Sequence, residues 1–188
     1  MRITGGRLGS RRLSAPSGDA TRPTSDRVRE ALFSVLAGRG VLQGARVLDA
    51  FAGTGALGLE SLSRGAAYVA FVERDAKAIA CLRTNVAELS VSDCCKVHAC
   101  TVEIFLKQAD KPYSLIFADP PYSLVRSESF AKLWSNLTDN LSLGGTAVLE
   151  HDTRDPSPNS PHATLVSSRS YGDTTIAIYV AQPSEAAS

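Results

Sequence analysis

Strand-like and helical segments alternate between residues 45 and 150, and this alternation limits the possible folds more than any other feature of the sequence. The helical segments repeat apolar residues at intervals of three and four positions, whereas the strand-like segments are short and bounded by turn residues. In chain order they are 46–49 (strand), 57–64 (helix), 67–73 (strand), 75–89 (helix), 96–99 (strand), 102–109 (helix), 113–118 (strand), 130–141 (helix) and 147–150 (strand). Strands separated by helices pair in parallel through right-handed crossovers. We therefore expect an α/β fold with five parallel strands.

The C-terminal part of the chain leaves this alternation. After a turn-rich stretch over residues 152–162, residues 163–168 and 174–181 are strand-like, and the turn Tyr171-Gly172-Asp173 lies between them. Two strands joined by a tight turn, with no helix between them, form an antiparallel hairpin. The expected sheet is thus seven-stranded and mostly parallel with an antiparallel C-terminal hairpin, and residues 183–188 form a frayed tail.

The N-terminal part, residues 1–40, is expected to be an arm followed by one helix. Residues 1–23 are rich in Gly, Arg and Ser, which predicts a short hairpin or an extended arm. Thr24 or Ser25 can then cap a helix that repeats apolar residues along one face. Residues 41–182 would form the main domain.

Positive charge is concentrated at the N-terminus, although the whole chain carries a formal net charge of only +1. Seven arginines lie within the first 30 residues, against three acidic residues. Arginine suits phosphate because its planar guanidinium donates two hydrogen bonds at once. The arm is therefore expected to contact nucleic acid, and the alternative is a solvated basic tail.

Nothing in the sequence points to a membrane, an export route or a metal. No apolar run approaches the roughly 20 residues that span a bilayer, and the first residues lack the apolar segment of a secretory signal. The four cysteines form no C-x-x-C pair and the three histidines form no ligand set. We expect a cytoplasmic protein with reduced thiols and no bound metal.

A glycine-rich loop follows the first strand of the main domain. The stretch Asp49-Ala-Phe-Ala-Gly-Thr-Gly-Ala-Leu-Gly58 places a G-x-G-x-x-G pattern between a strand and a helix. Glu73 ends the second strand about 20 residues beyond Gly53, where a carboxylate can bind the two hydroxyls of a ribose. The loop predicts a nucleoside-containing cofactor, either a nicotinamide dinucleotide or S-adenosylmethionine, although a plain glycine turn would carry the same pattern.

The acid at the end of the first strand, Asp49, favours S-adenosylmethionine. A carboxylate there would repel the pyrophosphate of a dinucleotide, but it would attract the ammonium or sulfonium of S-adenosylmethionine. A nicotinamide-dependent oxidoreductase would also need a substrate domain, and none follows the predicted fold. We keep that oxidoreductase as the alternative.

The sequence Asp119-Pro120-Pro121-Tyr122 directly follows the fourth strand, which places it in the ligand crevice. An exocyclic amino nitrogen of a base is a poor nucleophile because its lone pair is delocalised into the ring. Acceptors on both of its hydrogens, the Asp119 carboxylate and the Pro120 carbonyl, can draw the nitrogen toward tetrahedral geometry. The two prolines fix the loop, and Tyr122 offers a face on which the base can stack. The motif predicts methyl transfer to an amino nitrogen, and its alternative is an ordinary proline turn.

These motifs together resemble those of the bacterial 16S ribosomal RNA guanine-N2 methyltransferases of the RsmD type. The resemblance rests on the block from Arg22 to Phe33 (RPTSDRVREALF), on the glycine-rich loop through Glu60 and on Asp119 to Tyr122, and it covers nearly the whole chain. It implies a Rossmann-like class I methyltransferase fold that uses S-adenosylmethionine. It also implies methylation of one guanine N2 in small-subunit ribosomal RNA, within an assembled or partly assembled particle.

The resemblance further implies which residues form the site. The residues expected at the cofactor are Asp49, Phe51, Gly53, Thr54, Gly55, Glu73, Arg74, Thr101, Val102 and Asp119. Those expected to hold the target base and its amino group are Asp119, Pro120, Pro121 and Tyr122. Those expected to face RNA are Arg22, Thr24, Arg27 and Arg29.

One stretch departs from the family pattern. Such enzymes usually place Asp or Asn after the third strand, where it holds the adenine amino group, but here the stretch reads Ala99-Cys100-Thr101-Val102. Thr101 can accept one hydrogen bond but has no charge, so adenine is held by Thr101 or by the main chain.

Other acceptors and one other class of protein remain open at this point. A DNA amino-methyltransferase would need a target-recognition segment, and a protein-glutamine methyltransferase usually carries Asn where Asp119 stands. A non-catalytic RNA-binding assembly factor would need the arginine arm but not Asp119. With no evident interface stripe in the sequence, we expect a monomer.

Overall fold

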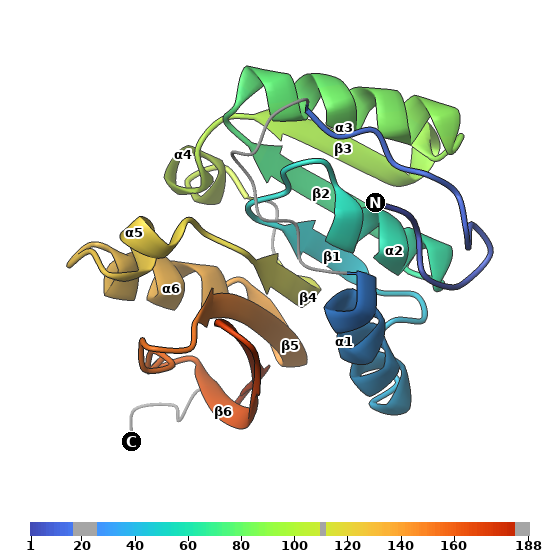
Figure 1. Ribbon diagram of the computed structural model, residues 1–188. Coiled ribbons are helices and arrows are strands. Elements are labelled where there is room, and N and C mark those ends of the chain that lie inside the picture. The colour runs from blue at the N-terminus through green and yellow to red at the C-terminus, as the bar shows by residue number, and fades with distance from the viewer. Residues whose placement is uncertain (17–25, 110–111, 183–188) are drawn as a thin grey trace.

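The computed structural model describes residues 1–16, 26–109 and 112–182, and these form one seven-stranded sheet with helices on both faces (Figure 1). The elements are, in chain order, α1 (Asp26–Gly38), β1 (Arg46–Asp49), α2 (Ala56–Ser63), β2 (Tyr68–Glu73), α3 (Ala76–Glu88), a 3-10 turn (Ser92–Cys94), β3 (Cys95–Ala99), α4 (Val102–Leu106), β4 (Tyr113–Ala118), α5 (Tyr122–Val125), α6 (Phe130–Thr138), β5 (Leu141–Asp152), β6 (Ala163–Tyr171) and β7 (Thr174–Ala181). The strand order is β3-β2-β1-β4-β5-β7-β6. Strands β1 to β5 pair in parallel, and β7 pairs antiparallel with both β5 and β6. The predicted mostly parallel sheet with its antiparallel hairpin is confirmed.

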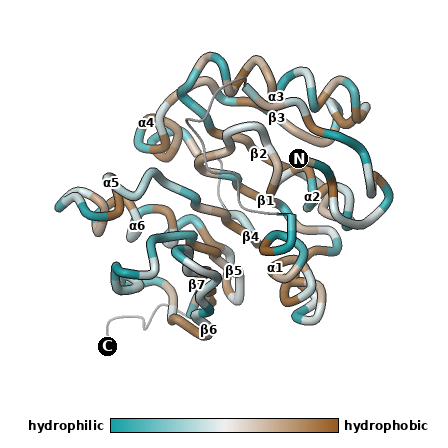
Figure 2. Tube along the Cα trace, in the orientation of Figure 1, coloured by the Kyte–Doolittle hydropathy of each residue, from teal (hydrophilic) through white to brown (hydrophobic). Residues whose placement is uncertain are grey.

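Residues of the central strands alternate between two apolar layers. Val47, Phe117 and Val148 belong to a cluster that includes side chains of α1, α2 and α3. Leu48 and Ile116, which alternate with them, belong to a second cluster that includes side chains of α4 and α6. Figure 1 shows α1, α2 and α3 on one side of the sheet and α4, α5 and α6 on the other, and Figure 2 shows hydrophobic colouring along the central strands. Because these strands are buried on both faces, functional polar groups are confined to the strand ends and loops.

The N-terminal segment, residues 1–16, packs on the same core as the rest of the chain. Ile3 and Leu13 are buried in the cluster that contains α1, α2 and α3. An antiparallel bridge between Arg2 and Arg12 gives the segment a hairpin shape, one of the two shapes expected from the sequence. The segment is therefore part of the folded domain.

A buried ionic cluster around Glu60 of α2 joins this segment to α1. Glu60 is 0% exposed, and its carboxylate accepts hydrogen bonds from the main-chain N–H of Thr4 (2.6 Å), the hydroxyl of Thr4 (2.8 Å) and Nε of Arg64 (2.7 Å). Nε of Arg29 in α1 lies 3.7 Å from the same carboxylate. Arg29 is also 0% exposed, and it donates a hydrogen bond to the Asp26 carboxylate at 2.8 Å. Since buried charges are tolerated only when they pair, these contacts fix α1 and the N-terminal segment against α2.

The boundary between α6 and β5 differs from the expectation. The helix expected over residues 130–141 ends at Thr138, and β5 already begins at Leu141. The register of β5 against β4 shifts across the stretch that contains Gly144 and Gly145. The two glycines therefore lie in an irregular part of the strand and not in a turn before it, and the φ of +72° at Gly144 suits a bulge.

Two features are absent from the described residues, a membrane-spanning helix and a cluster of metal ligands. No helix among them is long and apolar enough to cross a bilayer. No three His, Cys, Asp or Glu side chains among them gather in a group that could hold a metal ion.

Candidate active site at the carboxyl ends of the strands

Acidic side chains gather at the edge of the sheet where four strands end. Asp49 ends β1, Glu73 ends β2, Asp119 directly follows β4, and Glu150 lies near the end of β5. The carboxyl ends of parallel strands meet at one edge, which is where open α/β sheets bind ligands. This edge is the candidate active site.

The glycine-rich loop between β1 and α2 lies at the same edge. Gly53 and Gly55 have φ values of +53° and +84°, a region that residues with a Cβ rarely adopt. Gly58 has a different role, because a Cβ at this position would lie 2.2 Å from a ring carbon of Phe71. The first two glycines therefore shape the turn, and the third lets α2 pack closely on β2.

Glu73 connects this loop to the end of β2. One of its carboxylate oxygens accepts a hydrogen bond from the N–H of Gly53 at 2.8 Å. The other accepts from the N–H groups of Arg74 and Asp75, each at 2.8 Å. A carboxylate oxygen can accept more than one hydrogen bond, so hydroxyl groups of a ligand beside the loop can still bind here. The side chain of Arg74 is exposed at the same turn.

Asp49 is a buried acid at the centre of this edge. It is 2% exposed, and its Oδ2 accepts a hydrogen bond from the N–H of Gly58 at 2.9 Å. Burial raises the pKa of Asp49 to about 7; the hydrogen bond from Gly58 opposes this rise, and the charge of Glu73 adds to it. A positively charged ligand would stabilise the ionised form, so the position favours a cation.

Asp119 lies at the point where β4 emerges between β1 and β5. Burial raises the pKa of Asp119 well above its usual value, and the nearby carboxylates of Glu150 and Asp49 raise it further. A carboxylate with a raised pKa holds a proton more strongly than an exposed aspartate does, which suits a group that must accept one.

The rest of the D-P-P-Y loop is held by its surroundings. Pro120 is buried, and Pro121 is the N-cap of α5, a short helix that the sequence did not predict. The hydroxyl of Tyr122 lies 3.1 Å from the hydroxyl of Thr174 in β7. This hydrogen bond fixes the far end of a half-buried aromatic ring at the edge of the site.

The residues after β3 lie at the same edge of the sheet. Thr101 is the N-cap of α4, and its hydroxyl oxygen accepts a hydrogen bond from the N–H of Ile104 at 3.4 Å. Val102 is buried, and Phe51 packs against the same apolar cluster. The Thr101 hydroxyl keeps its proton and a second lone pair, so a ligand at this position would meet either the hydroxyl or the main chain.

One buried amide, Asn85 of α3, was not among the residues expected in the site. Asn85 is 0% exposed, and its Nδ2 donates to the main-chain oxygen of Thr54 in the glycine-rich loop at 2.9 Å. The same amide exchanges hydrogen bonds with the main chain of Ser14, at 2.7 Å and 3.1 Å. It therefore ties the N-terminal segment to the loop, and its signal in the sequence is a single polar residue next to Val86 on the apolar face of the helix.

The arginine block divides into different environments. Arg22 and Thr24 lie outside the described residues. Arg27 is exposed in the first turn of α1. Arg29 is fully buried in the cluster around Glu60, so the expectation that it binds RNA is wrong.

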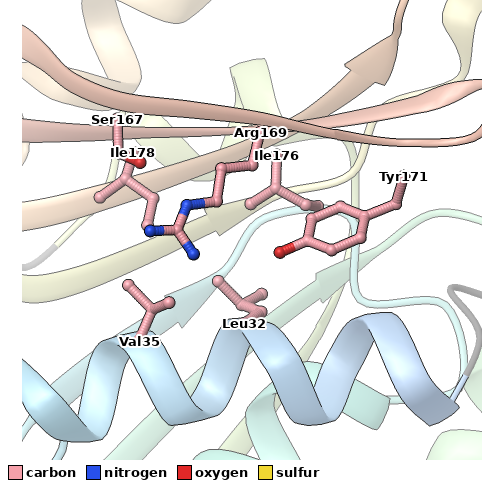
Figure 3. A pocket seen from close by; sticks show the side chains of 7 residues that line it. All are labelled: Leu32, Val35, Ser167, Arg169, Tyr171, Ile176 and Ile178. Atoms are coloured by element: carbon pink, nitrogen blue, oxygen red, sulfur yellow. The ribbon is translucent and has the colours of Figure 1, made fainter.

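The first turn of α1 lies toward the edge that holds the acids. Leu32 of α1 and Ile176 of β7 line one small pocket between the helix and the sheet (Figure 3), and Ile176 is the register partner of Glu150. The end of α1 leads into the start of β1, at the opposite edge of the sheet. Arg27, which precedes Leu32 by more than one helical turn, is therefore on the side of the candidate site.

The chain is similar to known proteins over nearly its whole length. The family model described as conserved hypothetical protein 95 matches residues 1–180. The chain is 36% identical over 186 residues to "Putative rRNA methyltransferase YlbH" of Bacillus subtilis, which covers 95% of this chain and 98% of that protein. It is 43% identical over 122 residues to "Ribosomal RNA small subunit methyltransferase D" of Escherichia coli K12, which covers 65% of this chain and 60% of that protein. The solved structure described as "Putative methyltransferase yhhF from Escherichia coli" matches with a TM-score of 0.85 at 34% identity, over 97% of this chain and 98% of that one.

Proposed function

Since the chain belongs to the conserved hypothetical protein 95 family, the family of the RsmD-type ribosomal RNA methyltransferases, we propose that it methylates the exocyclic N2 of a guanine in 16S ribosomal RNA. The observation that carries this proposal is the D-P-P-Y loop at the end of β4, beside the buried acid at the end of β1. The protein is proposed to act as a monomer in the cytoplasm, on a small-subunit particle.

The residues at the strand ends fit S-adenosylmethionine, the methyl donor of this fold class. When bound, this cofactor supplies a methyl group on a sulfonium, which is already electrophilic. Glu73, beside the glycine-rich loop, is placed to accept hydrogen bonds from the ribose hydroxyls. Asp49 supplies a buried negative charge for the ammonium or the sulfonium.

The D-P-P-Y loop prepares the acceptor nitrogen. The Asp119 carboxylate and the Pro120 carbonyl accept hydrogen bonds from the two N2 hydrogens, and this localises the lone pair for in-line attack on the methyl group. With the methyl donor bound, N2 would gain a methyl group and would lose one of its two hydrogens as a proton. Asp119, whose pKa is raised, is the group placed to accept that proton.

Cofactor affinity is expected to increase with pH through the titration of Asp49. Below about pH 7 the Asp49 carboxyl is protonated and neutral, and above this pH it carries the charge that attracts a cation. Isothermal titration calorimetry between pH 6 and pH 8.5 should show affinity for S-adenosylmethionine rising by up to about tenfold per unit below the pKa and levelling above it.

The matched control for this titration is Asp49→Asn, which keeps an acceptor for the N–H of Gly58 but cannot ionise. Its affinity should be lower at pH 8.5 and should vary less with pH. Equal wild-type affinities at pH 6 and pH 8.5 would show that the charge of Asp49 does not contribute to cofactor binding.

RNA binding is proposed to use the exposed arginine at the start of α1. Arg27→Ala should weaken RNA binding and should reduce the slope of log affinity against log salt by at most about one unit, the value for one lost phosphate contact. The measurement is filter binding or fluorescence anisotropy at several salt concentrations. Arg39→Ala, an exposed arginine just beyond the opposite end of the helix, is the control and should keep the wild-type slope. An unchanged slope in Arg27→Ala would exclude a phosphate contact by this residue.

The function is tested by methyl transfer to small ribosomal subunits isolated from cells that lack this gene. Labelled S-adenosylmethionine is the donor, and nucleoside analysis identifies the product. Labelled N2-methylguanosine at one site would support methyl transfer as the reaction, N2 as the methylated atom and 16S ribosomal RNA as the substrate. Cofactor binding without label in RNA would retain the fold class and reject this substrate, and DNA and protein acceptors would then be tested. Cofactor-independent binding to the particle would favour an assembly factor.

A further inference from the structure

We propose that Glu150 selects guanine, because its carboxylate accepts a hydrogen bond from the N1–H of the target base while Asp119 and the Pro120 carbonyl hold the N2 amino group. This inference rests on the proposed function and names the group that would distinguish guanine from other bases with an amino group.

The register places Glu150 beside Asp119. Leu149 of β5 pairs with Ala118 of β4, and the two acids are the next residues on these neighbouring parallel strands. Phe117 and Val148 lie in the same apolar layer. Side chains on a strand alternate between faces, and a shift of two positions returns to the same face, so Asp119 and Glu150 point to the face of Phe117 and Val148.

Glu150 is enclosed within the site. It is 7% exposed, and its charge is close enough to raise the pKa of Asp119. The next acid along β5, Asp152, accepts hydrogen bonds from Arg126 and Arg154 at 2.8 Å and 2.5 Å. Of these two acids, Glu150 is the one that the register places beside Asp119 and the D-P-P-Y loop.

The hydrogen-bonding groups along the edge of guanine identify N1–H as the group that Glu150 would bind. In guanine the N1–H lies next to the N2 amino group, so a base whose N2 is bound by Asp119 presents N1–H to a neighbouring acceptor. An ionised carboxylate is an acceptor only. Adenine and cytosine carry an unprotonated ring nitrogen beside their amino groups, and its lone pair would repel the Glu150 carboxylate. A buried group left without its hydrogen bond gives strong discrimination between otherwise similar substrates.

The test compares two RNA substrates that carry the same 2-amino group. The RNA methylated in the assay above is prepared with guanosine or with 2-aminopurine riboside at the target position, and 2-aminopurine has an unprotonated N1. We expect the wild type to favour guanosine by roughly 10- to 100-fold in kcat/KM, the range for losing a hydrogen bond to a charged group. In Glu150→Gln the ratio should fall to about threefold or less, because the glutamine amide can donate to N1 as well as accept from N1–H. Glu88→Gln, at an exposed carboxylate on α3, is the control and should keep the wild-type ratio.

Each result has a separate meaning. Equal wild-type rates on the two RNAs would overturn the role of Glu150, whatever the variant does. An unchanged ratio in Glu150→Gln, or a loss of its affinity for S-adenosylmethionine by calorimetry, would also overturn it. If the wild type does not methylate the guanosine RNA, the proposed function itself fails.

Discussion

Asp119→Ala is expected to lower kcat for methyl transfer by about a thousandfold, within the range observed when a general base is removed. The substitution removes both an acceptor for an N2 hydrogen and the carboxylate whose pKa is raised by burial, by Glu150 and by Asp49. Affinity for S-adenosylmethionine and for RNA should be retained, because Asp49 and Glu73, the acids proposed to bind the cofactor, stay in place. Single-turnover methylation and calorimetry measure the two properties separately.

Asp119→Asn separates the two roles of this side chain. Asparagine keeps an oxygen that can accept a hydrogen bond from N2 but cannot accept a proton. Its rate should lie between those of the wild type and Asp119→Ala, with a weaker dependence on pH. If Asp119→Ala loses cofactor binding instead, the assignment of Asp119 to the acceptor base is wrong.

Glu60→Ala is expected to lower the free energy of unfolding by about 3–5 kcal/mol, the usual effect of removing one partner of a buried ion pair. The substitution leaves the fully buried Arg29 without a neighbouring carboxylate on α2 and frees the main-chain N–H of Thr4. In a chain of this length the melting temperature should fall by roughly 10 °C or more. Urea unfolding and differential scanning calorimetry are the measurements.

Two further variants test the cause of this loss. Glu30→Ala removes an exposed acid from α1 and should change stability by less than about 0.5 kcal/mol. The double variant Arg29→Met, Glu60→Met removes both buried charges and should recover part of the loss, since an apolar pair of similar size can replace a buried ion pair. A wild-type melting temperature in Glu60→Ala would show that the cluster does not stabilise the fold.

The sequence predicted the parallel and antiparallel pairing of the strands and the edge that carries the site, because both follow from local patterns. The alternation of segments requires parallel pairing, and acids that end successive strands must meet at one edge. Asp49, Glu73 and Asp119 are therefore at that edge as expected. Glu150 followed the same rule and was overlooked, although it is an acid at the end of an apolar strand.

The errors have tertiary causes. Arg29 belongs to a run of arginines that resembles a phosphate-binding block, but its burial depends on Glu60, far along the sequence, and no local pattern reports this. The end of α6 was misplaced because Leu141 continues the apolar repeat of the helix while its main chain pairs with β4. The amide of Asn85 could not be assigned because its partners lie in two distant segments.

The cluster around Glu60 also determines the order in which the domain can assemble. Thr4 and Glu60 are separated by 56 residues, so their contact closes a long loop and forms only after much of the intervening chain is ordered. Synthesis proceeds from the N-terminus, and Arg29 and Thr4 are therefore made before the Glu60 carboxylate that they contact. Until α2 has left the ribosome, Arg29 has only the carboxylate of Asp26 beside it, and the docking of the N-terminal segment on α2 is expected to be a late event in folding.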